Sequence, residues 1–140
     1  MEIRTQAHAA YRLMYYIVWI PKFRQKIMVT GVKKYCEEVI RTYIAERYPD
    51  VSIEEIKIMK DHVHMVAVIP PKYAIAKVVG DIKANSSKEI RKKFEYIRRN
   101  PATWSIGYFV SSVGLDEKKI RQYVQYQEKQ DKGQTKFVLE

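Results

Sequence analysis

Residues 62–69, with the sequence HVHMVAVI, constrain the fold of this chain more than any other segment. Side chains of a strand alternate between its two faces, and here both faces are mainly apolar. A strand with two apolar faces is buried on both, so it lies inside a sheet that is covered on each side. One face carries His62, His64, Val66 and Val68, and the other carries Val63, Met65, Ala67 and Ile69. The segment therefore predicts a central strand with two imidazoles on one face.

The other segments show strand and helix patterns in turn. Residues 11–20 are rich in β-branched and aromatic residues and stop before Pro21, which predicts a strand. Apolar residues recur at helical spacing within 31–48 and stop before Pro49, which predicts a helix. We further predict strands over 51–60 and 105–113, and helical segments over 73–83, 86–99 and 116–131.

Two of these helix starts depend on side chains that cap a helix. Ser86 followed by Glu89 forms a capping box, so a separate helical segment is expected to begin there. Asp116 is the expected N-cap of the last helix. The N-terminus around His8 and the tail at 132–140 are expected to be loose.

The order of these elements is β-α-β-β-α-β followed by one extra helix. This is the split βαβ, or ferredoxin-like, arrangement of an α+β domain, whose first and third strands are central. The third strand is segment 62–69, in agreement with its two apolar faces. A plain ferredoxin-like domain has helices on one face only, so helix 116–131, from the same chain or from a partner, is expected to cover the second. No linker or repeat interrupts the chain, so we expect residues 1–140 to form one domain.

The charge of the chain favours a polyanionic partner. The net charge is +10, and residues 71–140 carry 15 Lys and Arg against 8 Asp and Glu, whereas residues 1–70 carry 11 against 8. Such an excess favours nucleic acid, although a solvated helix face is the simpler alternative. The candidate contacts within 83–99 are Lys83, Lys88, Arg91, Lys92, Arg98 and Arg99.

Cysteine content and hydropathy narrow the class of protein. The single cysteine, Cys36, excludes an internal disulfide and a multi-cysteine zinc site. No apolar run approaches the roughly 18–20 residues of a membrane helix, and the first residues lack an apolar signal-peptide core. We therefore expect a soluble intracellular protein without a membrane partner.

His62 and His64 form a candidate metal site. Residues i and i+2 of a strand point the same way, so both rings can offer a nitrogen to one ion. Two imidazoles are a partial ligand set for a divalent transition metal, and a third ligand would come from elsewhere. The alternative is a pair of histidines hydrogen-bonded at a strand end, because a His-x-His sequence is short and arises by chance.

Helix 116–131 carries polar groups suited to the same chemistry. Tyr123 and Gln127 are four residues apart and share a helical face above Ile120. Gln127 offers an amide oxygen to a hard divalent ion. Tyr123 offers a phenol, which has a free pKa of about 10 and is a weak nucleophile at neutral pH unless a base or a metal assists it. The alternative is that Tyr123 and Tyr126 only pack the helix onto the sheet.

Together these features resemble the single-tyrosine HUH transposases, small enzymes that move insertion sequences of the two-hundred/six-hundred-five type in bacteria and archaea. The segment DHVHMV, residues 61–66, is similar to the HUH motif of the family, with Val63 as its apolar middle residue. Residues 11–28 are similar to the family's first strand and the turn after it. GYFVSSVG (107–114) and IRQYVQYQ (120–127) are similar to its final strand and catalytic helix.

The resemblance implies a role for each site residue. It implies that His62, His64 and Gln127 ligate Mg²⁺ or Mn²⁺, and that Tyr123 is the nucleophile that forms a 5′-phosphotyrosine link. Tyr126 stays open as an alternative nucleophile, and Asp61 receives no role.

The resemblance also implies the partners and the location. The expected substrate is single-stranded DNA with hairpins near the ends of an insertion sequence. The expected assembly is a homodimer whose active sites can be shared between subunits. The expected location is the cytoplasm of a prokaryote, in association with the nucleoid.

Other functions are compatible with the same sequence features. A domesticated relative that processes repeated hairpins would have the same site, and a rolling-circle replication initiator would share the chemistry but usually has further domains. A non-enzymatic RNA-binding ferredoxin-like domain would need exposed aromatic residues on strand 11–20. A structural zinc protein would need more ligands than this chain has, unless two chains share an ion.

Overall fold

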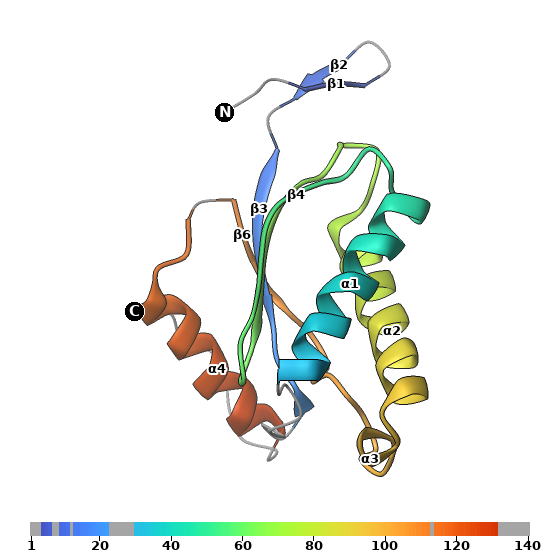
Figure 1. Ribbon diagram of the computed structural model, residues 1–140. Coiled ribbons are helices and arrows are strands. Elements are labelled where there is room, and N and C mark those ends of the chain that lie inside the picture. Colours follow the sequence, from blue (N-terminus) through green and yellow to red (C-terminus); the bar gives the residue numbers. More distant parts are fainter. Residues whose placement is uncertain (1–3, 7–8, 12, 23–29, 113, 132–140) are drawn as a thin grey trace.

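The computed structural model describes residues 4–6, 9–11, 13–22, 30–112 and 114–131 of the chain (Figure 1). Four helices and six strands lie in these segments. The helices are α1 (Thr30–Arg47), α2 (Ile75–Lys93), α3 (Glu95–Arg98) and α4 (Glu117–Asp131). The strands are β1 (Arg4–Gln6), β2 (Ala9–Tyr11), β3 (Met14–Trp19), β4 (Ser52–Ile58), β5 (Val63–Val68) and β6 (Phe109–Ser111).

Four of the strands form one antiparallel sheet in the order β4-β5-β3-β6. The central strands are therefore β3 and β5, which confirms the predicted positions of segments 11–20 and 62–69. Val18 of β3 lies opposite His64 of β5, so these two side chains share a face of the sheet. Together with the helices, this sheet order is the predicted ferredoxin-like α+β fold.

Helices cover both faces of this sheet (Figure 1). Helices α1 and α2 lie on one face, where Val63, Met65, Ala67 and Ile69 of the β5 segment join the main core. Helix α4 lies on the other face, where Tyr123 and Val124 pack against Val18 and Ile20 in a second buried cluster. The extra helix of the same chain thus covers the second face of the sheet, as the two apolar faces of segment 62–69 predicted.

Helix α1 buries a single stripe of residues. Val32, Cys36, Ile40 and Ile44 recur every four residues and are at most 3% exposed. Burial raises the pKa of the Cys36 thiol to about 12, so this cysteine is a core residue and not a reactive thiol.

The predicted helix start at Ser86 is wrong. Helix α2 runs without a break from Ile75 to Lys93, and Ser86 is fully buried on its inner face between Ile82 and Ile90. The Ser86 hydroxyl donates to the carbonyl of Lys83 at 3.2 Å and accepts from Trp104 Nε1 at 3.0 Å. A serine with partners on both sides can stay inside a helix, so the capping sequence does not interrupt it.

The ends of two predicted strands also differ from the structure. Tyr11 belongs to β2, which pairs antiparallel with β1, a pairing that the sequence did not predict. The predicted strand 105–113 is reduced to β6, while Trp104 forms a separate bridge with Pro21. Gly107 lies between these two pairings with a φ of 97°, a conformation that interrupts an extended strand and favours glycine.

Asp116 caps α4 as predicted, because its Oδ1 accepts from the backbone N–H of Lys119 at 2.8 Å. No helix in the described part of the chain combines the length and the apolar character needed to cross a membrane. His8 and the tail at 132–140 lie outside the described residues.

Candidate active site

His64 lies near the start of β5 and His62 lies directly before the strand, beside the face that α4 covers. His64 is half-buried, and burial lowers the pKa of its imidazole below the usual value. Its Nε2 is buried and has no hydrogen-bond partner within the described segments. A buried ring nitrogen of this kind is unusual, because such groups normally have a partner. This nitrogen is therefore a candidate metal ligand when the proton of the neutral ring lies on Nδ1.

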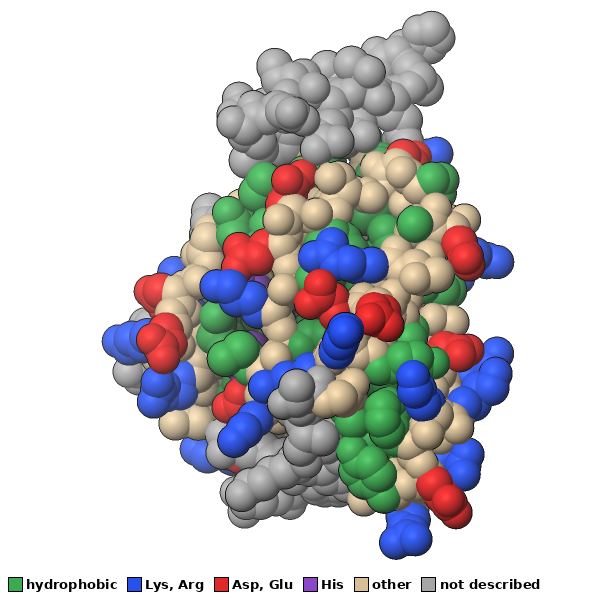
Figure 2. Space-filling model, viewed as in Figure 1, with side chains coloured by type: hydrophobic (Ala, Val, Ile, Leu, Met, Phe, Trp, Pro, Cys, Tyr) green, Lys and Arg blue, Asp and Glu red, His purple; other side chains and the backbone are tan. Residues whose placement is uncertain are grey.

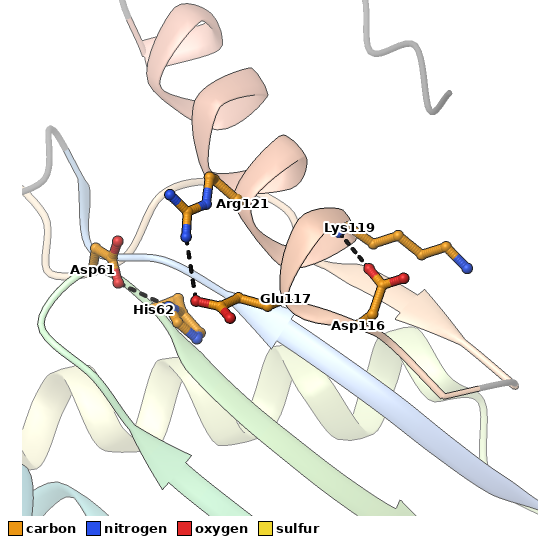
Figure 3. A network of polar contacts seen from close by, with 6 residues as sticks. All are labelled: Asp61, His62, Asp116, Glu117, Lys119 and Arg121. Carbon is orange, nitrogen blue, oxygen red and sulfur yellow. Dashed lines mark hydrogen bonds and ion pairs between the residues drawn. The ribbon is translucent and has the colours of Figure 1, made fainter.

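His62 lies beside a cavity of about 430 Å³ between the β4–β5 turn and α4. Its Nδ1 is 2.8 Å from Asp61 Oδ1, while Glu117 and Arg121 reach toward the same region from α4 (Figure 3). Glu117 Oε1 pairs with Arg121 Nη2 at 3.2 Å. The cavity wall is completed by Met59, Ile120, Val124 and Gln125.

The ligands near these histidines fit a metal ion only in part. Within the described residues, no group of three or more His, Cys, Asp and Glu side chains comes together to hold one. His64 offers an unpartnered Nε2. Two imidazoles need a further ligand, and an amide or water oxygen meets that need for Mg²⁺ or Mn²⁺. This chemistry fits the predicted use of Gln127.

Tyr123 and Gln127 lie together on α4, as their spacing predicted. The Tyr123 hydroxyl donates to Gln127 Oε1 at 3.3 Å, and the two residues are 3% and 6% exposed. The ring of Phe109 lies 5.6 Å from the Tyr123 ring. The pKa of the Tyr123 phenol is raised well above its usual value, chiefly by burial and further by Tyr126 and Asp131.

The structure places this pair away from the His62 cavity. Tyr123 packs against β3 and β6, while Gln127 lines a separate cavity of about 290 Å³ with Lys22 and Tyr126. The wall of the His62 cavity comes from other residues of α4, among them Val124. The histidines thus lie on the sheet face that the helix carrying Tyr123 and Gln127 covers, as predicted. In this arrangement, however, His62 and Gln127 line different cavities.

The C-terminal end of α4 is fixed by residues that the sequence did not indicate. Ser105 Oγ donates to Asp131 Oδ2 at 2.7 Å. Lys83 of α2 donates to the carbonyls of Ser105 and Gly107 at 2.8 and 2.6 Å. These partners are 22 to 26 residues apart in sequence, so only the fold reveals the contacts.

The candidate nucleic-acid contacts lie on α2 and α3, across the sheet from the histidines. Lys88, Lys92, Arg98 and Arg99 are exposed, and Figure 2 shows Lys and Arg side chains around the edge of the molecule where these helices end. Arg91 Nη2 donates to the Arg98 carbonyl at 3.3 Å, and Arg98 Nη1 donates to the Lys92 carbonyl at 3.3 Å. Lys83 differs from the others because its amine is held by backbone carbonyls.

Comparison with known sequences identifies the family of the chain. The family model described as "Transposase IS200 like" matches residues 9–127. The chain is 30% identical over 132 residues to the transposase for insertion sequence element IS200 of Salmonella typhimurium, which covers 92% of this chain and 86% of that protein. It is 23% identical over 131 residues to the ISDra2 transposase TnpA of Deinococcus radiodurans, which covers 91% and 92%.

Comparison with solved structures supports the fold. A crystal structure of a transposase from Deinococcus radiodurans matches with a TM-score of 0.77 at 21% identity, over 89% of this chain and 97% of that one. A REP-associated tyrosine transposase bound to a REP hairpin matches with a TM-score of 0.50 at 14% identity, over 93% and 74%. Because the family model spans most of the sequence and the fold agrees, the chain belongs to the IS200-like transposase family.

Proposed function

We propose that this transposase cleaves and rejoins single-stranded DNA at the ends of an insertion sequence, with Tyr123 as the nucleophile and a divalent metal ion as the activator. The observation that carries the proposal is the placement of His62 and His64, with a buried, unpartnered Nε2 on His64, on the sheet face covered by the tyrosine helix. A purely structural histidine pair gives no reason for such a nitrogen.

The residues that would hold the ion are His62, His64 and Gln127. Two imidazole nitrogens and one amide oxygen leave open positions on Mg²⁺ or Mn²⁺ for phosphate oxygens. When bound, the ion would act as a Lewis acid toward the scissile phosphate and orient it. The histidines bind in their neutral form, and the lowered pKa of His64 favours that form.

The proposed reaction exchanges one phosphate ester for another. The Tyr123 phenol loses its proton, its oxygen forms a bond to phosphorus, and the bond from phosphorus to the 3′-oxygen breaks. The products are a 5′-phosphotyrosine and a free 3′-OH. A 3′-OH can attack the same phosphorus and release the tyrosine, so rejoining needs no ATP. The raised pKa of the buried phenol means that Tyr123 is not ionised before it meets the DNA.

Tyr123 must change its surroundings before it can react. A side chain that is 3% exposed and bonded to Gln127 does not reach a phosphate. We propose that α4 moves as a unit, so that Tyr123 and Gln127 arrive together at a pair of histidines. In a homodimer these histidines belong either to the same subunit or to the partner.

DNA would be recognised separately from its cleavage. The similar REP-associated transposase is bound to a REP hairpin. We propose that hairpins near the element ends are likewise the partners of this chain. The exposed Lys88, Lys92, Arg98 and Arg99 are the candidate phosphate contacts, because lysine and arginine provide most of the affinity for the DNA backbone.

The test uses labelled single-stranded DNA from the ends of the element, Mn²⁺ or Mg²⁺, and denaturing gels that detect a covalent adduct. We expect an adduct with the wild type that disappears with EDTA and with Tyr123→Phe, and persists with the matched variant Tyr126→Phe. An adduct lost only with Tyr126→Phe keeps the reaction and moves the nucleophile. Tight DNA binding without any adduct would contradict the proposed reaction.

A further inference from the structure

Asp61 lies directly before the first site histidine, in the turn between β4 and β5. Its Oδ1 is 2.8 Å from His62 Nδ1, and the Met59 N–H donates to the His62 carbonyl at 2.8 Å across the same turn. The His62 side chain is 17% exposed and the Asp61 side chain 48%. The imidazole is therefore largely enclosed, and the carboxylate contacts one of its two nitrogens.

This contact decides which ring nitrogen carries the proton. An ionised carboxylate can only accept a hydrogen bond, so Nδ1 of His62 must donate it. In the neutral ring Nε2 then carries no proton, and its lone pair is free. Metal-bound histidines commonly donate their other ring N–H to a carboxylate in this way, which fixes the tautomer and the ring orientation.

We propose that Asp61 is a positioning residue, which holds His62 in the Nδ1–H tautomer and aims its Nε2 at a divalent cation. The inference rests on the metal assistance proposed above, and it gives Asp61 a role in the site.

Glu117, the other carboxylate near His62, pairs with Arg121 instead. Glu117 lines the same cavity, but its Oε1 pairs with Arg121 Nη2 at 3.2 Å (Figure 3). His62 Nδ1 therefore donates to Asp61 and not to Glu117, although both carboxylates line one cavity. Glu117 offers a matched control, because Glu117→Gln removes a negative charge from the cavity and leaves the Asp61–His62 bond in place.

Two measurements distinguish the positioning of His62 by Asp61 from a general disturbance of the β4–β5 turn. Nitrogen-15 NMR of the metal-free protein, at a pH where the rings are neutral, identifies the protonated nitrogen of His62 after assignment with His62→Gln. Titration with Mn²⁺, followed by electron paramagnetic resonance of the free ion, gives the affinity. Both are measured for the wild type, Asp61→Ala, Asp61→Asn and Glu117→Gln, and thermal unfolding checks that each variant is folded.

We expect the Nδ1–H tautomer in the wild type and in Glu117→Gln. Glu117→Gln and Asp61→Ala each remove one negative charge from the cavity, so Glu117→Gln should lower Mn²⁺ affinity less than Asp61→Ala, which also loses the hydrogen bond to His62. Asp61→Ala should shift His62 toward the Nε2–H tautomer and weaken Mn²⁺ binding by about 10-fold or more, the range seen when such partners are removed. Asp61→Asn keeps an acceptor oxygen and the shape of the turn, so it should retain the tautomer and lose part of the affinity.

The outcomes distinguish this inference from the function it rests on. A wild type that binds no Mn²⁺ overturns the proposed metal assistance and the role of Asp61 with it. A wild type that binds Mn²⁺ while Asp61→Ala binds it equally well overturns the role of Asp61 alone. An unchanged His62 tautomer in a folded Asp61→Ala protein also contradicts the inference.

Discussion

At the residue scale, the hydroxyl of Ser86 joins α2 to the segment before β6. It is fully buried, and it is the acceptor for the indole N–H of Trp104 at 3.0 Å. The Trp104 ring in turn meets Trp19 edge-on, with ring centroids 6.1 Å apart. The Ser86 hydroxyl thus provides the hydrogen-bond acceptor that the buried indole N–H of Trp104 requires, next to central strand β3.

Removing this hydroxyl should therefore be costly. Ser86→Ala would leave the buried indole N–H of Trp104 without its partner, and we expect a loss of about 1–3 kcal/mol in the free energy of unfolding. Denaturant unfolding measures it. Ser52→Ala is the control, because the hydroxyl of Ser52 bonds Glu54 at an exposed site and its loss should change stability by less than about 0.5 kcal/mol. Equal effects of the two substitutions would contradict the role of Ser86.

At the scale of elements, α4 combines a well-defined start with a buried tyrosine. Asp116 caps its first turn, and Ser105 holds Asp131 in its last turn. Between these ends Tyr123 and Val124 lie in the second buried cluster. If α4 moves to deliver Tyr123, its ends and this cluster set the free energy of the movement.

The cap at Asp116 gives a prediction for this element. Asp116→Ala removes the acceptor for the Lys119 N–H and should destabilise α4 by about 1 kcal/mol. Hydrogen exchange in the first turns of α4 should become several-fold faster, while amides in β5 keep their rate. Asp116→Asn retains an acceptor oxygen and should behave like the wild type. Faster exchange throughout the sheet would indicate global destabilisation instead.

At the scale of the whole molecule, the sheet separates two functional layers. Helix α4 lies on one face, and helices α2 and α3, whose exposed residues include Lys88, Lys92 and Arg98, lie on the other (Figure 1). His64 shares the α4 face, because it lies opposite Val18, which packs against Tyr123 and Val124. Lys83 connects the layers, because its amine on α2 holds the carbonyls of Ser105 and Gly107, and Ser105 holds α4.

The partly buried amine of Lys83 predicts a pH dependence of stability. Burial lowers its pKa to about 8, below the value of about 10.4 in an unfolded chain. Between these values the unfolded chain binds more protons than the folded one, so the contribution of Lys83 to stability rises with pH. A neutral amine still has two N–H groups for its two carbonyls. Stability of the wild type relative to Lys83→Met should therefore increase from pH 8 to 10, and a constant difference would contradict this.

The exposed basic residues predict the salt dependence of DNA binding. If Lys92, Arg98 and Arg99 contact phosphates, replacing each with Gln should reduce the slope of log affinity against log salt by about 0.7 for single-stranded DNA. Arg41→Gln is the control, because Arg41 lies on α1 and pairs with Glu37 at 3.0 Å. Titrations at several salt concentrations measure the slope. Equal slopes for all variants would place the DNA elsewhere.

The aromatic residues of β3 bear on the alternative RNA-binding function. Trp19 is fully buried, and Tyr15 and Tyr16 are partly buried between two helical layers. An RNA-binding ferredoxin-like sheet presents exposed aromatic residues to bases. The extra helix therefore removes the surface on which that alternative depends.

The sequence by itself determined the order of the main strands and helices along the chain, the two apolar faces of segment 62–69 and the pairing of Tyr123 with Gln127, because side-chain periodicity in strands and helices is local. It determined the cap at Asp116 for the same reason. Only the tertiary structure decided that Ser86 stays inside a helix, since its partner Trp104 is 18 residues away. Only the fold, likewise, placed Tyr123 apart from the His62 cavity and fixed Asp131 to Ser105. Such contacts depend on the packing of elements that are distant in sequence, and local sequence patterns do not predict this packing.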